Sequence, residues 1–186
     1  MSGLFTRGRL IGLALAVSIA AIDQAVKWYV IGPLQLRRVR NIEVLPFFDL
    51  TYVENRGISL GMLTATSMEM RWLLVLMTAI IALVVLIWMM REKLMGDILG
   101  LALILGGAIG NIRDRWDLGY VIDYADLHIG TFRPFLVFNI ADAAITIGVV
   151  IILARSLFLR DNDGEETSKD TLKDTNAPQT ERPVES

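Results

Sequence analysis

The sequence predicts an all-α membrane protein with four transmembrane helices, a small β-region after the first helix, and a short polar loop or helix between helices three and four. The 186-residue chain is 54% hydrophobic and has a mean hydropathy of +0.51, which is more apolar than a soluble domain of this length. Four apolar runs each come close to the roughly 20 residues that a helix needs to cross a bilayer. The second and third runs contain long stretches without a charged residue, which favours membrane insertion.

The first transmembrane helix is predicted over residues 10–31. Arg7 and Arg9 precede it, Trp28 near its end is typical of a membrane interface, and Gly32-Pro33 terminates it. A cleavable signal peptide is an alternative for the same charged and apolar start. The apolar character continues well beyond the small residues of a possible cleavage site, so we expect a spanning helix.

The rest of the chain is divided by its hydrophobic and polar patterns. Residues 43–54 are rich in β-branched and aromatic side chains with partial alternation, which predicts one or two short strands. The second and third spans are expected over 72–90 and 94–112, and glycines in the third allow close helix packing. The fourth is expected over 134–154. The hydrophilic tail, 160–186, lacks aromatic residues and is predicted to be disordered.

The charges are distributed unevenly along the chain. The formal net charge is −2, but the tail from Asp161 onward carries −5, so the preceding part carries +3, which suits anionic lipid head groups. The absence of cysteine excludes disulfides, thiol nucleophiles and cysteine metal sites. A single histidine, His128, cannot form a histidine-rich metal site, and any serine–histidine relay would depend on it. We therefore expect no metal and no cofactor.

Two polar side chains, Asn139 and Asp142, lie in the first half of the fourth apolar run. An ionised carboxylate in a membrane segment costs at least ~2.5–3.5 kcal/mol, so Asp142 needs a partner or a function. Asp123 precedes it by 19 residues and can fold back to the same membrane surface. Two adjacent carboxylates share a proton, and such a pair can activate water and protonate a leaving group. Asp126 fits the spacing equally well, and a structural ion pair of Asp142 with Arg115 is the alternative.

Four spans bring the end of helix one, the following loop, the end of helix three and the start of helix four to one membrane face. Asp23 and Lys27 have the i, i+4 spacing of a helical ion pair, and Arg115 can hold a carboxylate with two hydrogen bonds. Asn55 and Gly57 lie in a turn of the loop. The candidate residues expected at this face are Asp23, Lys27, Asn55, Gly57, Asn111, Asp114, Arg115, Asp123, Asn139 and Asp142.

Orientation does not follow from the charges alone. The positive-inside rule would place the arginine-rich loop with Arg37, Arg38 and Arg40 in the cytoplasm. The same arginines could bind lipid or substrate on the outer side, so both orientations stay open at this point.

Four segments, which carry five linked motifs, resemble the lipoprotein signal peptidase family, also called signal peptidase II. They are IDQAVK, VENRGISLG, GGAIGNIRDRWDLGYVIDYADLHIG and FNIADAAITIG, in the order expected for that family. The resemblance covers about residues 10–155. The chain departs from the family pattern in the second motif, at Arg56 and at 58–60.

The resemblance implies a four-helix aspartic endopeptidase of the bacterial inner membrane. Such an enzyme removes the signal peptide of prolipoproteins that carry a diacylglyceryl group, cleaving just before the lipidated cysteine. The implied partners are these substrates and membrane lipids, without nucleic acid, for a monomer without a cofactor. The peptidase domain would be 10–159, with its β-region and active site extracytoplasmic, and with 1–9 and 160–186 in the cytoplasm.

The resemblance also implies a role for each candidate residue. The catalytic dyad maps onto Asp123 and Asp142. The supporting motif residues map onto Asp23, Lys27, Asn55, Gly57, Asn111, Asp114, Arg115 and Asn139. Two other function classes are compatible with polar residues in these helices: a proton-coupled transporter with Asp23 and Asp142 as carriers, and a non-catalytic assembly factor.

Overall fold

The computed structural model describes residues 6–57 and 68–174, and of 158–174 only the course of the backbone. Four helices in the described residues are long and apolar enough to cross a membrane, which confirms the predicted fold class. They are α1 (Arg7–Ile31), α3 (Met68–Arg91), α4 (Met95–Asp117) and the Ile140–Leu157 part of α5 (Ile140–Asp174). The chain divides into two units, Met1–Ile152 and Leu153–Ser186, and the site lies in the first.

The fourth helix begins six residues later than the sequence predicted, at Ile140 instead of residue 134. The apolar residues before it form part of the sheet region, because Phe138 exchanges backbone hydrogen bonds with Ala125. The helix also extends past the predicted end to Asp174, over a stretch that contains no proline. The last part of the predicted tail, 175–186, lies outside the described residues.

A three-stranded antiparallel sheet has the order β1-β2-β3. β1 (Asn41–Leu45) and β2 (Phe48–Asn55) confirm the strands predicted over 43–54, and a short helix, α2 (Leu36–Val39), precedes them. β3 (Val121–Leu127) corrects the prediction of a polar loop or helix at this position. Its sequence forms a strand because β2 lies alongside, with Val53 opposite Asp123.

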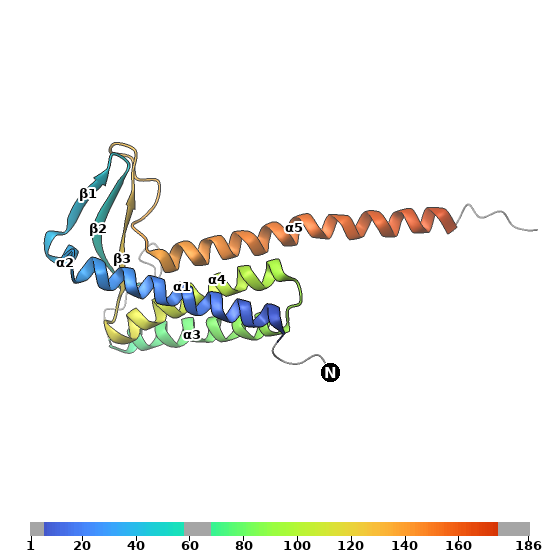
Figure 1. Ribbon diagram of the computed structural model, residues 1–186, viewed down its shortest axis with the longest axis horizontal. Coiled ribbons are helices and arrows are strands. Elements are labelled where there is room, and N and C mark those ends of the chain that lie inside the picture. Colours follow the sequence, from blue (N-terminus) through green and yellow to red (C-terminus); the bar gives the residue numbers. More distant parts are fainter. Residues whose placement is uncertain (1–5, 58–67, 175–186) are drawn as a thin grey trace, which may run out of the picture. The chain divides into compact units, whose positions relative to one another are not determined.

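Two hydrophobic cores hold these elements in place. The first joins α1, α3 and α4 within the bundle, with Ala16, Met89 and Leu101 among its buried residues. The second joins the end of α1 to the sheet through Val30 and Tyr52. Figure 1 shows the strands running across the end of the bundle at which α1 terminates. This arrangement brings β3 next to the ends of three helices.

Two glycines of α4 allow its neighbours to approach closely. A Cβ atom at Gly107 would lie 2.3 Å from the backbone oxygen of Ala141, in the first turn of α5. A Cβ atom at Gly110 would lie 2.6 Å from Oδ2 of Asp23 on α1. Both distances are much shorter than a normal van der Waals contact, so neither Cβ atom would fit without a shift. The missing side chains therefore leave room for the polar groups described next.

Candidate active site

Asp123 lies in the middle of β3 and is 2% exposed. Its Oδ2 accepts a hydrogen bond of 3.0 Å from Nδ2 of Asn55, which lies two residues along β2 from the strand partner of Asp123. Oδ1 accepts a hydrogen bond of 2.7 Å from Nδ2 of Asn139. The carboxylate is therefore held by two side-chain amides, one from the neighbouring strand and one from the start of α5.

Asp142 lies in the first turn of α5 and is half-buried. Its N–H donates to Oδ1 of Asn139 at 2.9 Å, and the Asn139 N–H donates back to Oδ2 of Asp142 at 3.4 Å. This reciprocal pair is a capping box, which satisfies free N–H groups at the start of a helix. Asn111 of α4 adds a hydrogen bond of 2.8 Å to Oδ1 of Asp142. The helix N-terminus favours a negative charge at this position.

Asn139 connects the two carboxylates. It is fully buried, and its single amide group contacts Asp123 through Nδ2 and the backbone of Asp142 through Oδ1. The same Nδ2 lies 3.3 Å from Oδ1 of Asn111 and 3.3 Å from the backbone oxygen of Ile122. The structure thus brings together the two aspartates that the sequence singled out, and this amide links them.

Burial and, after it, the nearby charge of Asp142 raise the pKa of Asp123 to about 7. The hydrogen bonds from Asn55 and Asn139 and the charge of Lys27 act in the opposite direction on this pKa. The raised pKa favours a proton on Asp123 compared with an ordinary exposed aspartate. A protonated carboxyl beside an ionised one is the state that two adjacent acids adopt most readily.

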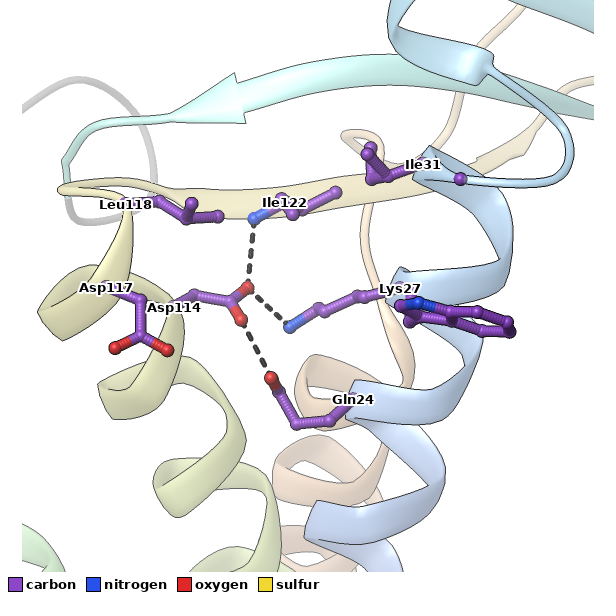
Figure 2. Close-up of a pocket in the computed structure, with 9 residues that line it drawn as sticks. Gln24, Lys27, Ile31, Asp114, Asp117, Leu118 and Ile122 are labelled. Atoms are coloured by element: carbon purple, nitrogen blue, oxygen red, sulfur yellow. Dashed lines mark hydrogen bonds and ion pairs between the residues drawn. The ribbon is translucent and has the colours of Figure 1, made fainter.

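Asp23, Lys27 and Asp114 form a buried ionic cluster next to the two aspartates. Nζ of Lys27 is 2.8 Å from Oδ2 of Asp23 and 2.8 Å from Oδ2 of Asp114, and all three residues are at most 3% exposed. The ion pair expected from the i, i+4 spacing in α1 is therefore present. Asp114 also accepts a hydrogen bond of 3.1 Å from the Ile122 N–H (Figure 2), and Asp23 accepts one of 3.1 Å from the Ala141 N–H.

Arg115 and Asn55 shape the start of the loop after β2. Nη2 of Arg115 donates to the backbone oxygen of Gly57 at 3.0 Å, while its guanidinium is attracted by the charges of Asp142 and Asp123. Oδ1 of Asn55 accepts from the Gly57 N–H at 3.2 Å, which directs the Asn55 amide nitrogen toward Asp123. The rest of this loop, 58–67, lies outside the described residues.

The structure separates Asp126 from the pair, although spacing could not. Residues three apart on a strand point to opposite faces, so Asp126 and Asp123 diverge. Asp126 accepts a 3.0 Å hydrogen bond from Oγ1 of Thr51 and forms an ion pair with Arg133. His128 also lies apart from the pair, next to Asp49. Strand alternation does not apply to the loop or helix that the sequence predicts for this segment, so spacing could not separate the two aspartates.

Two features of the site were missed at the sequence level. The Asn-x-x-Asp pattern from Asn139 to Asp142 is a capping-box signal and could have placed the start of α5. Gln24, next to Asp23, contacts the ionic cluster, and its sequence context contains no signal for that contact.

Fold and site together define a multi-pass membrane protein with two carboxylates, Asp123 and Asp142, that are both hydrogen-bonded to Asn139 at one end of its helices. A family model described as signal peptidase (SPase) II matches residues 15–158. The lipoprotein signal peptidase of Rhizorhabdus wittichii is 53% identical over 153 residues, covering 82% of this chain and 89% of that protein. That of Sphingopyxis alaskensis is 50% identical over 161 residues, covering 87% and 93%. The chain belongs to the signal peptidase II family and is a peptidase, as the resemblance in the sequence predicted.

Solved structures with the same fold agree with this membership. A bacterial membrane enzyme solved by the in meso method at 2.3 Å resolution has a TM-score of 0.69 and 25% identity, covering 94% of each chain. A second, solved at 1.9 Å resolution, has a TM-score of 0.66 and 27% identity, covering 79% of this chain and 92% of the other. Because the chain belongs to a peptidase family, a peptidase activity is favoured over the transporter and the assembly factor considered above.

Proposed function

We propose that this peptidase removes the signal peptide from bacterial prolipoproteins that already carry a diacylglyceryl group, cleaving just before the lipidated cysteine. We assign Asp123 and Asp142 as its catalytic dyad. The observation that carries this proposal is the buried Asn139. Its side-chain amide binds the carboxylate of Asp123 and the backbone N–H of Asp142, and its own backbone N–H donates to the carboxylate of Asp142. The substrate class is supported by the family and by its named relatives.

The different surroundings of the two carboxylates suggest their roles. Asp142 is half-buried in the first turn of α5, so water can reach it more easily than it reaches Asp123, and we assign it as the group that accepts a proton from water. Asp123 is almost completely buried, and its pKa of about 7 favours the protonated form that can donate. The water oxygen attacks the scissile carbonyl carbon, one water proton moves to Asp142, and the Asp123 proton moves to the carbonyl oxygen. When the intermediate collapses, Asp142 gives its proton to the leaving nitrogen and one hydroxyl of the gem-diol returns a proton to Asp123. The C–N bond breaks, the carboxylic acid and the amine are released, and the dyad regains its starting protonation.

The position of the dyad suits a substrate held in lipid. The signal helix and the acyl chains of a lipidated precursor both lie in the bilayer, so its cleavage site lies near the membrane surface. Binding at two points would orient the scissile bond over the dyad, which can contribute several kcal/mol to catalysis. One chain supplies both carboxylates, which supports action as a monomer. We place the enzyme in the inner membrane, with its site and sheet on the extracytoplasmic side.

Substitution of each aspartate tests the proposal. Asp123→Asn and Asp142→Asn should each lower the cleavage rate by about 10²–10⁴-fold, because each removes a proton-transfer group. Asp126→Asn, on the opposite face of the same strand, is the matched control and should cleave at the normal rate. The assay follows the mass of the peptide released from a lipidated and an unlipidated precursor by purified full-length protein in lipid. Normal cleavage by either dyad variant would refute the assignment, and equal cleavage of both precursors would refute the substrate class.

A further inference from the structure

Gln24 of α1 contacts both carboxylates of the ionic cluster. Its Nε2 donates to Oδ1 of Asp114 at 2.8 Å (Figure 2) and lies 3.3 Å from Oδ2 of Asp23 and 3.3 Å from the backbone oxygen of Gly110. The side chain thus spans the same two acids as Lys27, one helical turn away on the same element. The two side chains together are called the Gln24–Lys27 brace below.

Each acid of the cluster also accepts a hydrogen bond from the backbone N–H of the residue that precedes a dyad residue. Asp114 accepts the N–H of Ile122, the residue before Asp123. Asp23 accepts the N–H of Ala141, the residue before Asp142. A rotation or shift of either carboxylate therefore reaches the dyad through a single peptide unit. The two halves of the dyad come from β3 and α5, and both are tied to the same brace on α1.

Gln24 and Lys27 constrain the carboxylates in different ways. Lys27 is a compact point charge whose position holds the two carboxylates together without fixing their planes. Oδ2 of Asp114 receives both Lys27 and the Ile122 N–H, while Oδ1 receives Gln24. A carboxylate bound through both oxygens has a fixed plane, so Gln24 determines how Asp114 presents Oδ2 to β3.

We propose that Gln24 is a positioning residue of the peptidase reaction, which sets the placement of Asp123 and Asp142 through the carboxylates of Asp114 and Asp23. The inference rests on the proposed dyad. A cavity of about 280 Å³ lies beside Gln24, with Trp28 also in its wall, so hydrogen bonds and not close packing orient the amide. The same space accommodates a substituted side chain.

Two substitutions separate positioning from a general structural role. Gln24→Met keeps the length of the side chain and removes the donor, so it should lower kcat by about 10–100-fold at every pH and leave KM within about twofold. Gln24→Glu can donate only when its carboxyl group is protonated. Its kcat, relative to wild type at the same pH, should be as low as that of Gln24→Met at about pH 8 and should recover several-fold by about pH 5.

The charged groups around position 24 explain why the new acid would respond to pH in this range. Two acids of the cluster and one at the cavity rim disfavour another negative charge, against two cations. These groups are Asp23, Lys27, Asp114, Asp117 and Arg113. From β3, Asp123 interacts electrostatically with Lys27 and Tyr124 with Asp23, and the N–H groups of Ile122 and Ala141 bind Asp114 and Asp23. Gln35→Glu is the matched control, because Gln35 is exposed and caps α2 without a side-chain hydrogen bond. It should match wild type at both pH values.

The measurement is single-turnover and steady-state cleavage of a lipidated precursor by full-length protein in lipid. A Gln24→Met kcat within about twofold of wild type, or a Gln24→Glu ratio that does not change with pH, overturns the proposal. If Gln24→Met does not accumulate, Gln24→Glu decides alone, because one preparation is compared with itself at two pH values. Active Asp123→Asn or Asp142→Asn enzyme would instead refute the proposed dyad. If the dyad variants are inactive but Gln24→Glu does not recover activity at low pH, only the positioning role of Gln24 is refuted.

Discussion

Gly107→Ala should separate activity from stability in this enzyme. The added Cβ atom would lie 2.3 Å from the backbone oxygen of Ala141 and 2.8 Å from Cγ1 of Ile145, both on α5. Because non-bonded carbon contacts are relaxed only near 3.5 Å, α5 must move away from α4 by about 1 Å. The obstructing oxygen belongs to the backbone, so a change of side-chain rotamer cannot relieve the contact.

That displacement acts directly on the dyad. Asp142 follows Ala141, and Asn111 lies one turn after Gly107 on α4, where it donates to Asp142 at 2.8 Å. A shift of about 1 Å lengthens this hydrogen bond beyond its limit of roughly 3.2 Å. A misplacement of about 1 Å at a catalytic group costs about 10²-fold in rate. Overpacking costs ~1–3 kcal/mol, and the better helix propensity of alanine offsets up to ~1 kcal/mol, so the variant should remain folded.

Gly8→Ala is the matched control for this prediction. Its Cβ atom would meet Cδ1 of Ile98 at 3.4 Å and Sδ of Met95 at 3.6 Å, both ordinary contacts at the other end of the bundle. We would compare precursor cleavage and thermal unfolding of both variants with wild type. The reasoning is refuted if Gly107→Ala cleaves within about twofold of wild type, or if Gly8→Ala loses as much activity.

Three further predictions concern protonation and the buried polar groups. Burial raises the pKa of Asp123 to about 7, so loss of its proton should make kcat/KM fall as pH rises through about 7; a rate that is flat between about pH 6 and about pH 9 would contradict this. Lys27→Met should lower the free energy of unfolding by ~3–5 kcal/mol, because two buried carboxylates lose their counter-charge. Adding Asp23→Asn and Asp114→Asn should recover most of that loss in the same unfolding assay, and no recovery would show that the charges are not its cause. Asn139→Ala should lower the free energy of unfolding by ~1 kcal/mol, because α5 loses its N-terminal cap. It should also move the alkaline limit of the residual activity to higher pH, because the Asn139 hydrogen bond lowers the pKa of Asp123. An unchanged limit would show that this hydrogen bond does not act on Asp123.

The membrane spans could be predicted because hydropathy is a property of each segment by itself. The runs around 10–31, 72–90 and 94–112 match α1, α3 and α4 within a few residues. The fourth run was misplaced at its start, since an apolar residue such as Phe138 serves a sheet as well as a membrane helix. The family resemblance was also readable from short motifs, which need no knowledge of packing.

The choice between Asp123 and Asp126 could not be made from spacing. It depends on whether residues 121–127 form a strand, and they do so because β2 pairs with them from more than sixty positions earlier in the chain. Once the segment is extended, side-chain alternation directs the two aspartates to opposite faces. The link through Asn139 depends in the same way on where α5 begins.

The sequence by itself determined that this protein crosses a membrane, which family it belongs to, and that carboxylates lie where an unpartnered charge is costly. Those conclusions rest on composition, on short motifs and on the transfer free energies of single segments. Only the tertiary structure decided that Asp114 and Asp23 bind the backbone N–H groups of the residues before the dyad, and that Gln24 bridges the two acids. These contacts are hydrogen bonds between segments that are distant in the sequence, so they form only when the helices and the sheet pack together.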